Sequence, residues 1–185
     1  MYETADDPYC YSGTSVLKNR LGLRTKEQLS EFEAAITMQR ASEPLPDGSL
    51  DVDHYRALHH HLFQDVYDWA GQFRTVRIGR EGHWFCYPEN ISREMGRLFD
   101  ALIAEDRFEG LDTKAFAARA AHFLADLNAI PPFREGNGRT QNVFLWMLAA
   151  RAGTRSIFIG CTNHRDDKTK RPGVSRAFES LMSAT

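Results

Sequence analysis

The fold of this chain is decided by the stretch Ala129-Ile130-Pro131-Pro132-Phe133-Arg134-Glu135-Gly136-Asn137-Gly138-Arg139-Thr140-Gln141-Asn142, which joins an alanine-rich apolar segment to a strongly apolar one. Its glycines can adopt positive φ and let backbone N–H groups approach a ligand closely. Successive N–H groups in such a turn form a concave site for phosphate. A helix that starts near Arg139 would point its positive end at the same place, and the guanidinium of Arg139 suits phosphate oxygens. This stretch therefore predicts an anion-binding loop.

An acid beside that loop indicates a cation. Glu135 next to a bound phosphate requires a positive ion between them, and Mg²⁺ held by one carboxylate plus substrate phosphates is the usual arrangement. The alternative is that Gly136-Asn137-Gly138 is only a turn between two helices, since Gly and Asn are the ordinary residues for positive φ. The acid before the glycines and the arginine after them favour a site for a nucleotide or polyphosphate with a divalent ion.

Composition limits the class of protein. At 185 residues, 42% hydrophobic and 26% charged, the chain suits one globular domain over residues 1–185. Its net charge of −2 does not indicate a basic surface that would bind nucleic acid or an anionic membrane. The first seven residues lack the pattern of a signal peptide, and the longest apolar run, 143–150, is too short to span a bilayer. Three widely spaced cysteines indicate reduced thiols in a cytoplasmic protein.

Hydrophobic periodicity predicts an all-α fold with one short hairpin near residues 72–87 and about six to eight helices. In the first helix, Leu29, Phe32, Ala35 and Ile36 stand at helical spacing. The alternating run 72–78 and the run 84–87, separated by a turn at 79–82, form the expected hairpin. The expected helices cover residues 26–40 after a Thr25 cap, from Asp51 to Gly71, 89–104, from Asp112 or Thr113 to Ala129, 139–150 and 175–182.

Histidines in two of these helices invite other interpretations. His59-His60-His61 cannot chelate one ion together, because consecutive helical residues point about 100° apart. We expect them to pack or to face solvent. His122 lies on a helix ahead of the central loop, where a histidine is more often a satisfied core residue than a catalyst.

The central stretch resembles the signature of the Fic family, which reads His-x-Phe-x-(Asp/Glu)-Gly-Asn-Gly-Arg-x-x-Arg. Phe133 and residues 135–139 match it, whereas Pro131 stands at the position of the family's histidine and Asn142 at that of its second arginine. Further segments resemble family landmarks in family order, namely Asp7-Pro8-Tyr9, residues 17–22, residues 63–71 and Arg74-Thr75-Val76. The resemblance covers most of the chain and implies a Fic-fold helical domain.

The resemblance also implies an activity. Family members transfer AMP from ATP to a hydroxyl side chain of a target protein, with the motif histidine as base, the acid as Mg²⁺ ligand, and the asparagine and both arginines on phosphates. By position, Glu135 is the metal ligand, and the nucleotide-binding residues are Gly136, Asn137, Gly138, Arg139 and Asn142. Phe133 would anchor the loop in the core. Pro131 leaves the base absent, because proline cannot accept a proton.

Partners follow from the same resemblance. The hairpin corresponds to the flap that holds the target protein over the nucleotide, which assigns Thr75, Val76, Arg77, Ile78 and Phe85 to target binding. A hairpin with a free edge can hold a peptide by strand addition, and the alternative is that it only packs on the helices. The resemblance further implies a small antitoxin partner and a cytoplasmic location, with delivery to another cell as an effector as the alternative.

Three functions remain open. The chain is an attenuated AMP transferase or one with another base, His122 being the first to test; or it is a pseudoenzyme that holds a nucleotide or partner without turnover; or it uses another donor, such as one of phosphate or phosphocholine. The intact residues 135–139 favour the first two. Residues 175–179 partly resemble the family's inhibitory helix, but Asn142 lacks the guanidinium that its glutamate would grip, so Glu179 is not expected to gate nucleotide binding.

Overall fold

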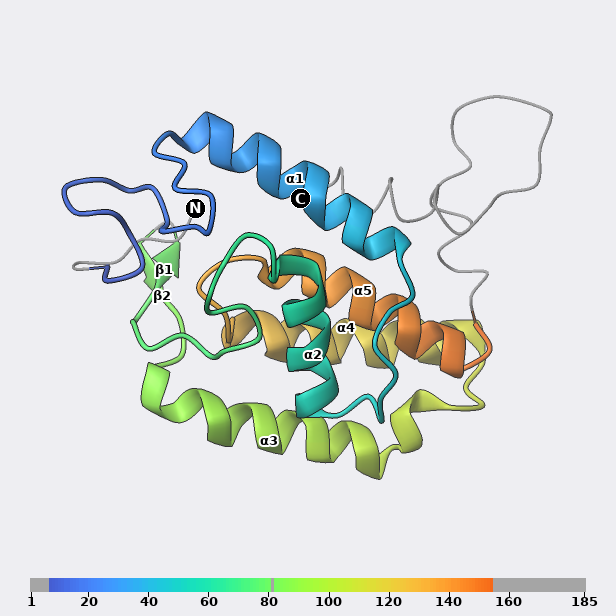
Figure 1. Ribbon diagram of the computed structural model, residues 1–185. Coiled ribbons are helices and arrows are strands. Elements are labelled where there is room, and N and C mark those ends of the chain that lie inside the picture. The colour runs from blue at the N-terminus through green and yellow to red at the C-terminus, as the bar shows by residue number, and fades with distance from the viewer. Residues whose placement is uncertain (1–6, 81, 155–185) are drawn as a thin grey trace.

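The protein is described by a computed structural model over residues 7–80 and 82–154 (Figure 1). Within these residues it is mostly helical and has one antiparallel strand pair, which confirms the predicted all-α class with a short hairpin. The expected helix at 175–182 lies outside the described residues. The elements are α1 (Lys26–Ser42), α2 (Val52–Phe63), β1 (Gly79–Arg80), β2 (His83–Trp84), α3 (Pro88–Ala104), the 3-10 helix η1 (Asp106–Phe108), α4 (Thr113–Ala129) and α5 (Asn137–Arg151).

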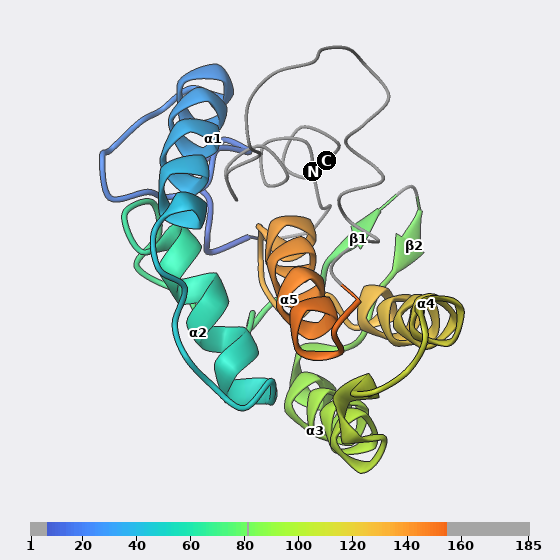
Figure 2. The same cartoon turned by 90° about the vertical axis from the view of Figure 1, so that its right-hand side faces the viewer.

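Helix α5 lies at the centre of the fold. It packs against α2 on one side and α4 on the other, while α1 packs on α2 and α3 packs on α4 (Figure 2). Val143, Phe144 and Leu148 of α5 have no exposed surface. The nearly all-round apolar sequence of this helix predicts that burial. The start of α5, where the central loop ends, is therefore held in the middle of the molecule.

Local signals set most helix boundaries. The side chains of Thr25, Asp51 and Asp112 each accept a hydrogen bond from a backbone N–H in the first turn of the following helix, as good N-caps do. Helix α4 ends at Ala129, as the proline at position 131 predicts. These boundaries agree with the sequence-based ones to within about two residues, which is the usual uncertainty of helix ends.

The segment after α2 departs from the prediction. Helix α2 ends at Phe63 rather than Gly71, and the chain then folds back through turns, so that the Gly71 N–H donates to His59 Nδ1 at 2.8 Å. Residues 72–78 are not a strand. The backbone N–H of Arg74 donates to Pro132 O at 2.9 Å, which ties this segment to the central loop rather than to a neighbouring strand. The ladder is confined to β1 and β2.

Helix α1 buries two polar residues beside its expected apolar ones. Its buried residues are Leu29, Glu33, Thr37 and Ala41, whereas Phe32, Ala35 and Ile36 are partly or fully exposed. The apolar residues of α1 still contact the core, since Phe32 and Ile36 pack against it while partly exposed, but the most deeply buried positions include the two polar residues Glu33 and Thr37.

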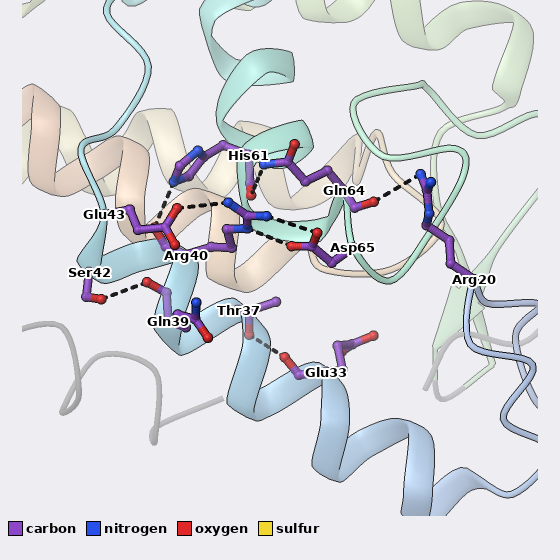
Figure 3. A network of polar contacts seen from close by, with 10 residues as sticks. All are labelled: Arg20, Glu33, Thr37, Gln39, Arg40, Ser42, Glu43, His61, Gln64 and Asp65. Carbon is purple, nitrogen blue, oxygen red and sulfur yellow. Dashed lines mark hydrogen bonds and ion pairs between the residues drawn. The ribbon is translucent and has the colours of Figure 1, made fainter.

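Polar contacts join the end of α1 to the segment around α2 (Figure 3). The Arg40 guanidinium donates to both carboxylate oxygens of Asp65, at 2.6 and 2.9 Å, and to Glu43 at 2.9 Å. The Nε2 of His61 bonds the backbone oxygen of Arg40 at 2.7 Å. These contacts fix the end of α1 against α2 and the turn that follows it.

Two further sequence expectations concern the whole described chain. Across residues 7–80 and 82–154, none of the helices combines the length and the apolar character that crossing a membrane would need. Cys10 and Cys86 are both free thiols in that part of the chain, while Cys161 lies outside it.

Candidate nucleotide site

A pocket of about 560 Å³ opens between α1, the central loop and the start of α5. Its size falls within the range of small-ligand sites. α1, β1, α4 and α5 all contribute to it, so it forms only when the chain is folded. The lining residues are Ser30, Glu33, Ala34, Thr37, Met38, Arg80, Asn128, Glu135, Gly136, Asn137, Gly138, Arg139 and Gln141.

The N-terminus of α5 lies at this pocket, since Asn137, Gly138 and Arg139 all line it. The first hydrogen bond of the helix runs from the Thr140 N–H to Gly136 O at 3.1 Å, so the preceding N–H groups have no acceptor within the helix. Gly136 has φ of 79°, and a Cβ there would lie 2.3 Å from the Phe63 ring. The helix starts at Asn137 rather than Arg139, and Gly138 lies in its first turn instead of in a turn with positive φ. A helix N-terminus of this kind favours an anion.

The Asn137 side chain holds the loop together. Its Oδ1 accepts from the Phe133 N–H at 3.0 Å, and its Nδ2 donates to Phe133 O at 2.9 Å. Asn137 is only 3% exposed. Both ends of its side-chain amide are therefore engaged within the loop, where they stabilise the turn beside the pocket that Asn137 lines. The expected contact of Asn137 with phosphate stays a prediction.

Phe133 and His59 anchor the loop to the core of the protein. Phe133 is fully buried, and the His59 ring stacks on it with centroids 3.7 Å apart. His59 Nδ1 accepts from Gly71, so Nε2 carries the proton and donates to Glu135 O at 3.0 Å. Burial lowers the pKa of His59 to about 3, which keeps the ring neutral near pH 7. This histidine thus fixes the backbone of the candidate metal ligand.

Sequence analysis did not single out His59 among three neighbouring histidines. Its spacing of four residues from Tyr55 and from Phe63, both fully buried, was the available signal. In the part of the chain that the structure describes, no group of three or more His, Cys, Asp or Glu side chains is placed so that it could hold a metal ion.

Glu135 lies at the pocket with a raised pKa. Burial raises the pKa of its carboxyl group, and the neighbouring Glu33 carboxylate raises it further. One of its oxygens accepts from the Gly136 N–H at 3.1 Å. A single carboxylate in such surroundings fits a Mg²⁺ ion that takes its remaining ligands from phosphates and water.

The Arg139 side chain lines the same pocket and is held there by contacts with α1 and Phe63. It forms an ion pair with Glu33, donates to Thr37 Oγ1 at 3.2 Å, and lies 4.8 Å from the centre of the Phe63 ring. Glu33 also accepts a hydrogen bond from the Tyr67 hydroxyl. Sequence analysis missed Glu33 and Tyr67, because nothing in their local sequence marks a contact with a residue so far along the chain.

The other end of the loop, residues 130–133, is buried, and none of its side chains can act as a base. Arg74 donates to three successive carbonyls there: its N–H to Pro132 O, its Nε to Pro131 O at 2.8 Å, and its Nη2 to Ile130 O at 3.2 Å. Pro131 and Pro132 are both buried. The candidate base His122 is exposed on α4 and is not among the described residues that line the pocket.

Two of the expected site residues do not offer the side-chain contact that was expected of them. Asn142 is half-buried on α5, and it is not among the lining residues in the part of the chain that the structure describes. The Ile78 side chain is fully buried, so that it could meet a target only through its backbone.

The remaining hairpin residues lie at the surface. Thr75 is exposed, and its N–H donates to the Tyr9 hydroxyl at 3.1 Å. The Arg77 guanidinium lies 4.0 Å from the Tyr87 ring centre and 5.0 Å from that of Trp84. Those two aromatic rings are about half exposed, which makes them the largest accessible apolar surfaces of the hairpin region. Val76 and Phe85 are intermediate in exposure, and sequence analysis did not name Trp84 or Tyr87.

Comparisons with known proteins agree with this geometry. Residues 49–149 match the profile of the Fic/DOC family. The chain is 56% identical over 153 residues to a probable protein adenylyltransferase, y4lH, of Sinorhizobium fredii, covering 82% of this chain and 80% of that protein. It is 36% identical over 180 residues to the probable protein adenylyltransferase Fic of Escherichia coli, covering 95% and 88%.

A solved structure shows the same fold with a nucleotide analogue. The crystal structure of the effector protein BepC from Bartonella tribocorum, with bound AMPPNP, superposes with a TM-score of 0.70 at 28% identity. The match covers 78% of each chain.

Proposed function

Because the chain belongs to the Fic/DOC family, we propose that it is a protein adenylyltransferase of reduced turnover, which moves AMP from ATP to a hydroxyl side chain of a target protein. One observation carries the proposal. The unaltered residues Glu135 to Arg139 line a pocket of nucleotide size at the N-terminus of a buried helix. The nucleotide analogue bound by the similar BepC chain supports ATP as the donor.

Each pocket residue has a physical role in this scheme. The N-terminus of α5 and the Arg139 guanidinium attract the phosphates, and Glu135 would hold Mg²⁺, which neutralises phosphate charge when bound. The target hydroxyl attacks the α-phosphorus, and pyrophosphate leaves. Such transfer depends mainly on positioning and charge stabilisation, both of which the loop supplies.

The chain has no base at position 131 to remove the proton from the attacking hydroxyl group of the target. At position 131 the chain carries a buried proline, which cannot take up that proton. General-base catalysis contributes roughly 10²–10⁴-fold, so its absence slows transfer without removing the binding site. Asn142 adds to this effect, because an amide replaces the charged fork that the family places against the outer phosphate.

The alternative is a pseudoenzyme that binds a nucleotide or a partner protein without turnover. The same two positions, Pro131 and Asn142, favour it. A different donor is less well supported, since the run from Glu135 to Arg139 matches the signature of the AMP-transferring members.

The partners belong to the same proposal. The target protein would lie on the hairpin, where Thr75 and Trp84 are exposed and Arg77 is partly exposed. A small antitoxin is a further partner that family resemblance implies. The proposed location is the cytoplasm, and delivery to another cell is the alternative, which the similarity to BepC, a VirB-translocated effector of Bartonella tribocorum, favours.

Two measurements test the proposal. Titration calorimetry with ATP and Mg²⁺ should show saturable binding, and no binding at millimolar ATP would overturn the site itself. Incubation with a cell lysate and labelled ATP should then give weak transfer of an AMP mass to a protein. Binding without any transfer would favour the pseudoenzyme.

A further inference from the structure

We infer that Glu33 is a positioning residue for phosphate recognition, whose carboxylate fixes the direction of the Arg139 guanidinium at the pocket. The inference rests on the proposed nucleotide site. It adds a residue of α1, a helix that lies outside the residues 49–149 matched by the family profile.

Two residues one turn apart on α1 hold the guanidinium, and they can be followed in Figure 3. The Glu33 carboxylate pairs with Nη2 of Arg139, and Thr37 Oγ1 accepts from Nη1 at 3.2 Å. The Thr37 hydroxyl donates its own proton to Glu33 O at 2.7 Å, so its lone pairs are available to the arginine. The Phe63 ring beneath the guanidinium removes further freedom.

Glu33 is itself fixed by a third segment of the chain. The Tyr67 hydroxyl donates to its second carboxylate oxygen. Tyr67 is 1% exposed, Glu33 7% and Thr37 0%. Both oxygens of the carboxylate are therefore engaged inside the protein, and its orientation is set before any ligand arrives.

This arrangement excludes a role as a competitor for Arg139. A carboxylate that competes with phosphate must leave when phosphate binds, but Glu33 lies in the middle of α1 and is buried. Separating the Glu33 carboxylate from Arg139 would leave the buried negative charge of Glu33 without its ion-pair partner, which costs free energy. The contacts with α1 use two of the five N–H groups of the guanidinium, so others remain for a phosphate oxygen. A donor held in place in this way suits recognition of a charge at a fixed position.

The experiment uses two probes and one matched control. Binding of ATP with Mg²⁺ and of adenosine is measured by calorimetry for the full chain and its variants. Glu33→Gln keeps the size of the side chain and removes the charge, and it should weaken ATP binding about tenfold while leaving adenosine binding unchanged. Glu31→Gln, at an exposed position on the same helix, should change neither affinity.

A double-mutant cycle tests whether Glu33 acts through Arg139. In an Arg139→Gln background, Glu33→Gln should have no further effect on ATP binding, because the group that it orients is absent. Tyr67→Phe leaves the carboxylate in place and removes one of its anchors, so it should give a smaller loss of the same kind, about threefold. This variant keeps the inference testable if Glu33→Gln fails to fold.

The outcomes separate this inference from the proposed function. If the unmodified chain binds neither probe, both fail together. If it binds ATP but Glu33→Gln or Tyr67→Phe leaves the affinity unchanged, tightens it, or weakens ATP and adenosine equally, only the positioning role fails. A selective loss for ATP that disappears in the Arg139→Gln background supports it.

Discussion

The two ends of the central loop are both held by side chains from distant segments of the chain, but they offer different chemistry. At one end, the carbonyls of residues 130–132 all accept hydrogen bonds from the buried Arg74. At the other, the Glu135 carbonyl accepts from the buried His59, and the Arg139 side chain is held from α1. Only the second end presents a carboxylate, a helix N-terminus and a guanidinium to the pocket. Binding and proton transfer are therefore separable in this fold.

Arg74 explains how the base at position 131 can be absent while the backbone conformation of the loop is kept. Three of its contacts go to backbone oxygens of residues 130–132, which are the same for any side chain at position 131. A proline there does not disturb the anchoring. By the same reasoning, a histidine introduced at 131 would be carried by an unchanged backbone.

Restoring the base should have the largest effect. Pro131→His is expected to raise AMP transfer roughly 10²–10⁴-fold, the usual contribution of a general base. Asn142→Arg alone should raise it less, because that residue orients the donor and takes no proton. The double variant should exceed the product of the single gains, since the groups act as a unit. Incorporation of label into the target measures all three, and an unmodified chain as fast as the double variant would contradict the comparison.

Removing the metal ligand should weaken the binding end by itself. Glu135→Ala is expected to lower the affinity for ATP with Mg²⁺ roughly 10–100-fold, in line with the loss of a charged contact. With a chelator in place of Mg²⁺, the variant and the unmodified chain should bind ATP alike, because the carboxylate then has no cation to hold. A loss of the same size without Mg²⁺ would assign Glu135 to the structure of the loop instead.

The buried histidine beneath the loop predicts sensitivity to acid. The pKa of His59 is about 3 in the folded chain and near 6.5 when unfolded, so the unfolded state binds the extra proton between these values. The free energy of unfolding should therefore fall as pH drops below 6.5, by about 2 kcal/mol at pH 5 from this group. Glu135 opposes this change, because its raised pKa lets the folded state bind a proton more readily.

A variant isolates the histidine from that opposing group. Urea unfolding at pH 7 and pH 5 should show a smaller pH dependence for His59→Gln than for the unmodified chain. The two chains would respond to acid alike if His59 were protonated normally in the fold.

The smallest expected effect concerns the tail. Glu179→Gly, a change outside the described residues, should leave ATP affinity unchanged, because Asn142 offers an inhibitory glutamate no guanidinium. Calorimetry of the two chains measures it. Severalfold tighter ATP binding in the variant would show that Glu179 restrains nucleotide binding and would contradict the prediction.

The sequence by itself determined the elements that depend on neighbouring residues. Thr25, Asp51 and Asp112 cap their helices through bonds to the third residue that follows, and the apolar run of α5 predicts its burial wherever it packs. The loop composition likewise indicated an anion site, and the signature around Phe133 indicated the family, because both lie within one short stretch.

Only the tertiary structure decided which polar side chains support that stretch. Glu33 reaches Arg139, His59 reaches Glu135 and Arg74 reaches Pro131, each from a segment distant in the sequence. Helical periodicity marked Phe32 and Ile36, which pack against the core while partly exposed, but it did not mark Glu33 and Thr37, which are buried because Arg139 of α5 and Tyr67 supply hydrogen-bonding partners. The physical reason is that burial of a polar group depends on a hydrogen-bonding partner across the fold, which no local pattern contains.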